Sequence, residues 1–131
     1  MAEAPPWIAI VDDDPSVLKA LTRLLRTRGL RAKTYGSAQE FLATLPGGLP
    51  ESLIVDLQMP QMSGLELLHY LTEKDVPIPT IIITAHGDIG VRERCLAAGA
   101  AAFLLKPLQD KSLFAAIEAA RKAGRHGPVP S

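Results

Sequence analysis

Long apolar stretches, paired cysteines and an excess of one charge are all missing from this sequence. No uninterrupted hydrophobic run exceeds six residues, whereas a membrane-spanning helix needs about twenty. The start of the chain, MAEAPPWIAI, has no basic segment ahead of a long apolar one, so it does not resemble a secretory signal. The single cysteine, Cys95, cannot form an intrachain disulfide, which is typical of proteins from a reducing compartment. We therefore expect a cytoplasmic protein without membrane contact.

Charge and length limit the possible functions further. The sequence has 14 Lys and Arg residues against 14 Asp and Glu. This balance argues against a nucleic-acid-binding surface spread over the whole domain, although it permits a local basic patch. The 131 residues, 47% of them hydrophobic, suffice for one domain with a proper core. We place that domain at residues 7–123, after a disordered N-terminus (1–6) and before a flexible tail or the start of a linker (124–131).

Short apolar runs alternate with segments of helical periodicity along the whole domain. Continuous runs such as WIAIV and TIIIT suit strands of a parallel sheet that is buried on both faces. Asp14 and Pro15 are typical of the cap and first residue of a helix, and Ser37 with Glu40 has the spacing of a capping box. The expected strands are 7–11, 30–35, 53–56, 80–84 and 101–105, and the expected helices are 15–28, 37–45, 65–73, 89–98 and 110–123.

This alternation predicts an α/β fold: a doubly wound, flavodoxin-like, five-stranded parallel sheet with five helices. In such sheets ligands bind beyond the carboxyl ends of the strands, where the strand order reverses. Polar side chains stand at just those ends. With the strands in the order 2-1-3-4-5, we expect them to meet in one cleft; they are Asp12, Asp13, Asp56, Thr84 and Lys106.

The chemistry of these side chains favours a metal and phosphate site. Three carboxylates that lie close together cannot all stay ionised unless a cation or a pKa shift relieves them. An all-oxygen site of this kind suits Mg²⁺ (or Mn²⁺). Lys106 supplies a positive charge and Thr84 a hydrogen-bond donor for phosphate oxygens. In such surroundings Asp56 can act as a nucleophile that forms an acyl phosphate.

Four ordered motifs resemble the CheY-like receiver domain of two-component response regulators. They are VDDD at 11–14, DLQMPQMSG at 56–64, TAHGD at 84–88 and AAFLLKP at 101–107, and the resemblance covers about residues 7–122. The phrases SAQEFL, MSGLELL and TAHGD look most like the FixJ-like branch, whose members usually carry a C-terminal helix-turn-helix. No such output domain fits into this chain. We therefore expect either a stand-alone receiver or part of a longer protein with a linker beginning near Gly124.

The resemblance implies a role for each matching residue of the metal site. Asp56 corresponds to the phospho-acceptor, which takes a phosphoryl group from a histidine kinase. Asp13 corresponds to a direct metal ligand, and Asp12 to the acid that holds metal-bound water. Gln58 would offer its backbone carbonyl to the metal, and its side chain and that of His86 would tune the lifetime of the phosphate.

The resemblance also implies how the domain would signal. Lys106 would contact the phosphate, the hydroxyl of Thr84 would turn inward after phosphorylation, and Phe103 would change rotamer with it. The bond between Lys106 and Pro107 corresponds to one that is usually cis. The signal would then change the face formed by residues 89–98, 101–105 and 110–123, which could also form a homodimer. The expected output is transcription, with DNA bound only by an output domain absent from this chain.

Other interpretations are weighed against this switch. A pseudo-receiver, a binding module that ignores phosphate, would tolerate losses in the site, and the five polar residues are all present. A metal-dependent phosphatase usually presents a second acid two residues after its nucleophile, where this chain has Gln58.

Several residues have a simpler structural interpretation. Asp14 is more simply a helix cap than a third metal ligand, and Cys95 is more simply a small buried hydrophobe. His86 could be a plain loop residue, and Phe103 a plain core residue; Met59, Pro60 and Gly64 look structural. We expect a signalling domain that catalyses only its own phosphorylation and dephosphorylation.

Overall fold

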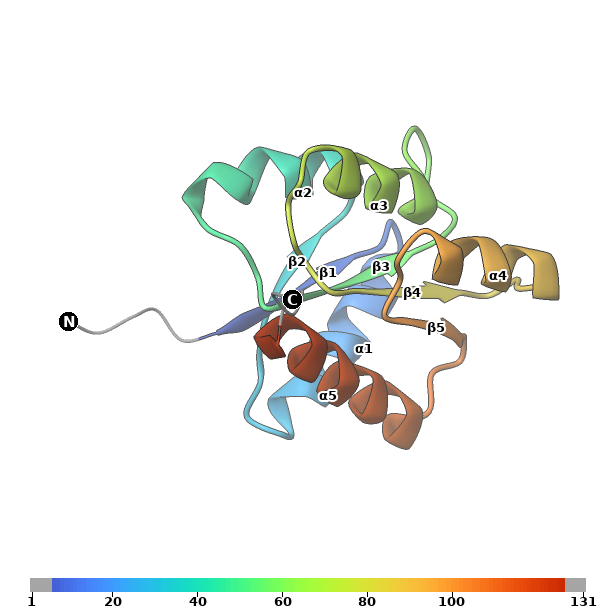
Figure 1. Ribbon diagram of the computed structural model, residues 1–131. Helices are drawn as coiled ribbons and strands as arrows, with labels where there is room; N and C mark the ends of the chain where they lie inside the picture. The colour runs from blue at the N-terminus through green and yellow to red at the C-terminus, as the bar shows by residue number, and fades with distance from the viewer. Residues whose placement is uncertain (1–5, 127–131) are drawn as a thin grey trace.

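The chain folds as five strands alternating with helices around one central sheet (Figure 1). The computed structural model describes residues 6–126. The strands are β1 (Trp7–Val11), β2 (Arg31–Tyr35), β3 (Ser52–Asp56), β4 (Thr80–Thr84) and β5 (Ala102–Leu105). The helices are α1 (Pro15–Arg26), α2 (Ala38–Thr44), α3 (Gly64–Glu73), α4 (Ile89–Ala97) and α5 (Asp110–His126), with a short 3-10 turn, η1 (Leu45–Gly47).

All strands are parallel, in the order β2-β1-β3-β4-β5, which confirms the predicted sheet. Helices α1 and α5 cover one face, and α2, α3 and α4 cover the other (Figure 1). A separate hydrophobic cluster fills each interface. The reversal of strand order between β1 and β3 leaves their carboxyl ends side by side, where a ligand can enter.

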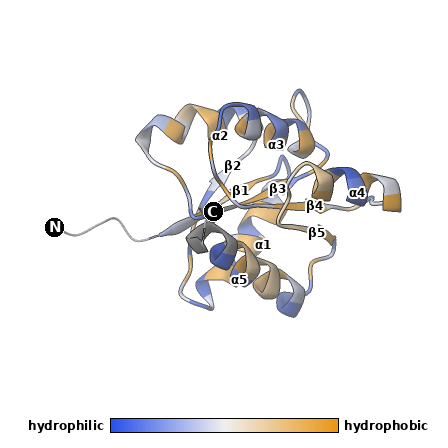
Figure 2. Cartoon of the chain, viewed as in Figure 1, coloured by the Kyte–Doolittle hydropathy of each residue, from blue (hydrophilic) through white to orange (hydrophobic). Residues whose placement is uncertain are grey.

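Burial follows the position of each strand in the sheet. Every residue of β3 and β4 is buried, because these central strands have helices on both faces. The edge strand β2 has no fully buried residue. The helices, in contrast, carry both hydrophilic and hydrophobic residues, as α3 and α4 show in Figure 2. Within the described part of the chain, no helix is long and apolar enough to cross a membrane.

The helices begin with the expected capping residues, except that the complete capping box lies at α3 and not at α2. The Asp14 side chain accepts a hydrogen bond from the Ser16 amide, and Pro15 is the first residue of α1, as predicted. At α2 only half of the predicted capping box forms, because the Glu40 carboxylate accepts from the Gly36 amide and not from that of Ser37. The complete, reciprocal capping box lies at the start of α3, where Ser63 and Glu66 exchange both hydrogen bonds.

The last helix ends later than predicted, whereas the first strand begins at the predicted residue 7. Helix α5 continues to His126, three residues beyond the expected end at residue 123. The single glycine at position 124 costs only about 1 kcal/mol in a helix, which does not end a helix of this length. Pro6 is described, and it is exposed. The rest of the predicted disordered N-terminus, residues 1–5, and the tail residues 127–131 lie outside the described residues.

Candidate functional site

Backbone hydrogen bonds fix the polar residues at the carboxyl edge of the sheet. Asp56 is the last residue of β3 and lies opposite Ile83 of β4. The Asp12 amide donates to the carbonyl of Tyr35 on β2. The Lys106 amide donates to the carbonyl of Thr84, just after β5. Each residue therefore directly follows or ends a strand, so its position is set by the sheet and not by a flexible loop.

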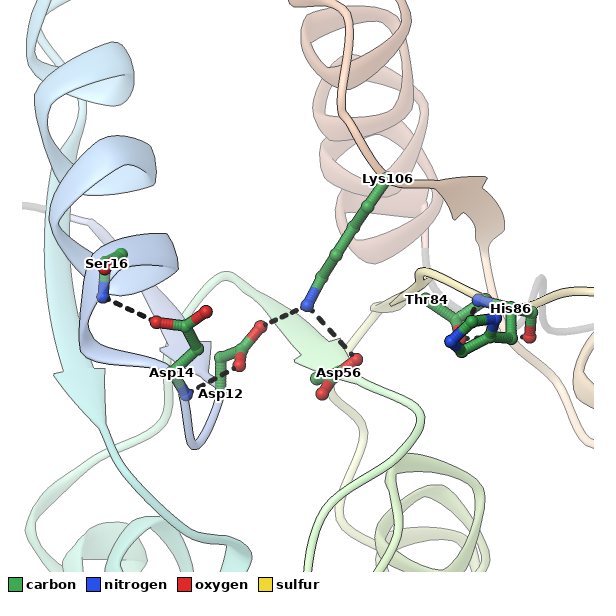
Figure 3. A network of polar contacts seen from close by, with 7 residues as sticks. All are labelled: Asp12, Asp14, Ser16, Asp56, Thr84, His86 and Lys106. Atoms are coloured by element: carbon green, nitrogen blue, oxygen red, sulfur yellow. Dashed lines mark hydrogen bonds and ion pairs between the residues drawn. The ribbon is translucent and has the colours of Figure 1, made fainter.

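Lys106 bridges two of the carboxylates (Figure 3). Its Nζ lies 2.9 Å from Oδ2 of Asp12 and 3.4 Å from Oδ1 of Asp56. Both carboxylates are buried: Asp12 is 0% and Asp56 5% exposed. Oδ1 of Asp12 also accepts a hydrogen bond from the Asp14 amide at 2.9 Å. Both oxygens of Asp12 are thus satisfied, as a buried carboxylate requires.

Asp13 completes a group of three carboxylates. Oxygens of Asp12, Asp13 and Asp56 all lie within 4.8 Å of one another. Asp13 is exposed, and none of the hydrogen bonds or ion pairs described for residues 6–126 includes its side chain. A cluster of hard oxygen donors with one free, solvent-facing carboxylate fits a divalent cation such as Mg²⁺, which binds carboxylates and keeps several waters.

The cluster raises the pKa of both Asp56 and Lys106. The pKa of Asp56 is raised above its ordinary value, first by burial and then by the negative charge of Asp12, against the lowering effect of Lys106. Burial alone would lower the pKa of Lys106, but its hydrogen bond to Asp12 and the charges of both carboxylates raise it. Lys106 is therefore positively charged at neutral pH, while the charge on Asp56 is held at a cost in free energy.

Thr84 does not join this cluster. Its hydroxyl donates to the carbonyl of His86 and accepts from the His86 amide, both at 3.1 Å. Figure 3 shows Thr84 and His86 together, apart from the group around Lys106. The expectation that all five polar residues meet in one cleft is thus met by four of them. The buried hydroxyl satisfies its hydrogen bonds inside the loop after β4, which local sequence spacing could not reveal.

The other residues singled out from the sequence differ in their surroundings. The side chains of Gln58 and His86 are exposed. Phe103 is half-buried and packs against the core under α2, α3 and α4. The Lys106–Pro107 peptide bond is cis, as expected. Cys95 is fully buried, and burial raises the pKa of its thiol, in agreement with the interpretation of a small hydrophobe.

Two glycines matter for reasons that the sequence did not reveal. A Cβ on Gly64 would lie 2.6 Å from the backbone oxygen of Asp56, so this glycine allows α3 to begin against the end of β3. The backbone of Gly64 has no positive φ, so this close approach, and not a left-handed turn, calls for glycine. A Cβ on Gly87 would meet Leu105 at 2.7 Å and the ring of Phe103 at 3.0 Å. In the sequence, Gly87 was noted only as part of the TAHGD motif, which does not reveal these contacts.

The raised pKa of Asp56 predicts that Asp56→Asn stabilises the metal-free protein at neutral pH. A carboxyl group with a higher pKa in the folded than in the unfolded state binds more protons when folded, so its contribution to stability falls as pH rises through that interval. We expect the variant to exceed the parent in free energy of unfolding at pH 7, because it removes a buried charge. The difference should shrink as the pH falls towards the ordinary pKa of aspartate. Urea unfolding in the presence of a chelator measures it.

The matched control for this prediction is Asp75→Asn, which removes an exposed carboxylate at the other end of α3. It should change stability little, because surface substitutions usually stay within about 0.5 kcal/mol. Two results would contradict a raised pKa of Asp56 in the folded protein: equal stability of the parent and Asp56→Asn at pH 7, or a difference between them that grows on acidification.

The sequence matches the family model described as the response regulator receiver domain over residues 8–118. Response regulator protein TmoT of Ectopseudomonas mendocina is 44% identical over 115 residues, which are 88% of this chain and 52% of that protein. The transcriptional regulatory protein FixJ of Rhizobium meliloti is 42% identical over 113 residues, 86% of this chain and 55% of the relative. The chain thus spans about half the length of the curated relatives it matches.

Solved structures give the same result for the fold. The crystal structure of FixJ-N superposes with a TM-score of 0.83 at 38% identity, covering 98% of this chain and all of the other. A response regulator receiver protein from Burkholderia phymatum superposes with a TM-score of 0.80 at 44% identity, covering 90% of this chain and 96% of the other. The architecture is therefore the CheY-like, flavodoxin-type fold that the sequence predicted.

Proposed function

The chain belongs to the family of response regulator receiver domains, and from this premise we propose that Asp56 accepts a phosphoryl group from a histidine kinase. The observation that carries the proposal is the arrangement around Asp56: a nearly buried carboxylate at the end of a central strand, with an ammonium 3.4 Å away. Packing gives no reason for three carboxylates and a lysine at one edge of the sheet. Phosphoryl transfer gives one, because it depends on positioning and charge neutralisation.

In the proposed step an oxygen of Asp56 attacks the phosphorus atom of a phosphohistidine. A P–O bond forms and the P–N bond breaks, and the imidazole leaves with the electron pair and takes a proton from solvent. Lys106 would stabilise the charge on the transferring oxygens, as fixed cations do in such sites. Hydrolysis of the acyl phosphate by water would return Asp56 to its carboxylate.

Family members generally bind Mg²⁺ at their acidic residues, and the oxygen cluster of this chain suits that ion. We assign Asp13, Asp56 and the backbone carbonyl of Gln58 as direct ligands, and Asp12 as the acid that holds metal-bound water. When bound, Mg²⁺ (or Mn²⁺) would offset negative charge on the phosphoryl oxygens. Asp12 would also keep Lys106 in place, through the contact of 2.9 Å.

The switch would run through the loop between β4 and α4. A phosphoryl group on Asp56 would offer the Thr84 hydroxyl a charged acceptor, and charge-assisted hydrogen bonds are stronger than the neutral ones that now join it to His86. Phe103 would follow into the space that Thr84 leaves, past the bare Cα of Gly87. The exposed side chains of Gln58 and His86 would tune the lifetime of the phosphate.

The output surface is the face of α4, β5 and α5. Ile89 is 76% and Leu105 55% exposed there, and both line a groove of about 670 Å³ whose lining also includes Lys106. Exposed large apolar side chains around a groove mark interaction sites, and we propose a homodimer across this face. Since the matched relatives are regulators about twice as long, we propose transcription as the output, in the cytoplasm, with DNA bound by a separate domain.

The alternative is a pseudo-receiver that binds partners without phosphorylation. One experiment separates the two: intact-mass spectrometry after incubation with Mg²⁺ and a small phosphodonor, with and without a chelator. We expect the mass of one phosphoryl group to be added to the parent only when metal is present, and none to be added to Asp56→Asn. A folded parent that gains no mass with Mg²⁺ would favour the pseudo-receiver, and a variant that still gains it would place the acceptor elsewhere.

A further inference from the structure

The charges of this chain balance in number but are distributed unevenly. Six of its 14 Lys and Arg residues fall within residues 15–36, and none of its 14 Asp and Glu residues does. The rest of the chain is correspondingly acidic. The basic residues are Lys19, Arg23, Arg26, Arg28, Arg31 and Lys33. They belong to α1, to the turn that follows it and to the edge strand β2, and we call them the basic edge.

The basic edge is exposed and free of acidic partners. All six of its residues are classed as exposed. None of the ion pairs found within residues 6–126 includes any of them. Two are held by aromatic rings: the Arg28 guanidinium lies 4.1 Å from the ring centre of Phe114, and the Lys33 ammonium 4.2 Å from that of Trp7. Such contacts orient a cation without neutralising its charge.

Three of the cations line one groove. Lys19, Arg23 and Arg26 are spaced so that they share one side of α1, and together with Thr22 and Thr34 they surround a groove of about 370 Å³ between α1 and β2. Leu18 is the only apolar side chain in its lining. The apolar side of α1 faces elsewhere, because Leu21 and Leu25 are buried in the core. The groove thus presents ammonium, guanidinium and hydroxyl groups together.

This composition suits a phosphate backbone better than a protein surface. Centres of protein–protein interfaces are depleted of charge and enriched in aromatic residues, and the groove has neither feature. Arg, Lys and Thr side chains contact DNA phosphates. These phosphates repeat along the duplex, so they can pair with several cations without a specific acidic residue for each. We propose that the basic edge binds the phosphate backbone of duplex DNA without reading its sequence. The balanced total charge excludes such a surface over the whole domain but not on this edge.

The choice of duplex DNA rests on the transcriptional output proposed above. The basic edge would add phosphate contacts to those of a separate DNA-binding domain. Its six residues belong to α1, to the turn that follows it and to β2, and one of them, Arg28, lies against Phe114 of α5. Binding at this edge does not require Asp56. Failure of one proposal is therefore distinguishable from failure of the other, because phosphorylation is measured by mass and DNA binding by titration.

The experiment measures binding of this chain to a fluorescent duplex by anisotropy, at several salt concentrations beginning near 20 mM. The test variant combines Lys19→Ala, Arg23→Ala and Arg26→Ala; alanine favours helices, so α1 should be retained. We expect a linear fall of log K with log salt, and a slope that is smaller by about 2 to 3 in the variant, since each phosphate contact contributes about 0.9. Affinity at low salt should drop by at least about tenfold. Phosphorylation of the variant should be unchanged.

Two controls sharpen the result. The combination of Lys74→Ala, Arg94→Ala and Lys111→Ala removes three exposed cations outside the basic edge and should leave the slope as in the parent. A variant with Arg23→Lys and Arg26→Lys keeps the charge and should keep most of the binding. The proposal is overturned if the parent does not bind at low salt, or if both alanine variants lose affinity equally. It is also overturned if polyglutamate of matched charge binds the parent as tightly as DNA, which would indicate an acidic protein as the partner.

Discussion

Replacing Lys106 by alanine is expected to slow phosphorylation of Asp56 by about a hundredfold, the usual cost of removing one fixed group that stabilises developing charge. Lys106 is the only cation within 4 Å of Asp56 among the described residues. Its pKa is raised by Asp12 and Asp56, so its charge is present throughout the neutral range. The rate can be followed by intact mass at saturating Mg²⁺, with a small phosphodonor in excess.

Two measurements separate this effect from damage to the fold. Lys111→Ala removes an exposed lysine five residues further along and should react like the parent. Urea unfolding should show that Lys106→Ala remains folded, although the loss of the 2.9 Å contact leaves Asp12 with only the Asp14 amide as partner. A variant that is phosphorylated at the parental rate would mean that Lys106 serves only to neutralise Asp12.

The sequence predicted best the positions of the polar residues that follow or end the strands. WIAIV, LIVD and TIIIT are apolar because they are buried on both faces, and a polar residue directly after such a run must lie at the carboxyl edge of a parallel sheet. This reasoning brought Asp12, Asp56 and Lys106 to one place, where the structure has them. The same alternation predicted a parallel sheet with right-handed crossovers, and the order 2-1-3-4-5 assumed for it is the order in the structure.

Contacts that depend on side-chain orientation were not predictable in this way. The spacing of Thr84 suggested a place in the cleft, but its hydroxyl is bound by the backbone of His86. Two serine–glutamate pairs have capping-box spacing, and only the structure shows that Ser63 and Glu66 complete theirs. Glycine is needed at position 64 because a Cβ there would meet the backbone of Asp56, a contact between two elements that the local sequence does not indicate. The Gly64 contact is set by packing between two elements, whereas the other two partners lie only two and three residues away and depend on the orientation of the side chains.

The metal assignment leads to the second large effect: Asp13→Asn is expected to weaken Mg²⁺ binding by about a hundredfold, because even residues that only support a metal ligand cost 10–100-fold. Asp13 is the exposed member of the carboxylate cluster. Asp12 is already bound to Lys106 and to the Asp14 amide, so it cannot replace Asp13 without giving up these contacts. Titration calorimetry with Mg²⁺ measures the affinity directly, without reference to phosphorylation.

Asp14→Asn is the matched control, because it makes the same chemical change one residue further on. Asp14 caps α1 through the Ser16 amide, and asparagine caps helices equally well. It should therefore bind Mg²⁺ like the parent, and Mg²⁺ should raise its resistance to urea as it does in the parent, since a ligand stabilises only the state that binds it. If Asp14→Asn lowered the affinity for Mg²⁺ as much as Asp13→Asn does, the ion would be attracted by the summed charge of the VDDD segment. No single carboxylate of that segment would then be its ligand. Loss confined to Asp13→Asn would instead assign the ion to the cleft between β1 and β3, next to Asp56.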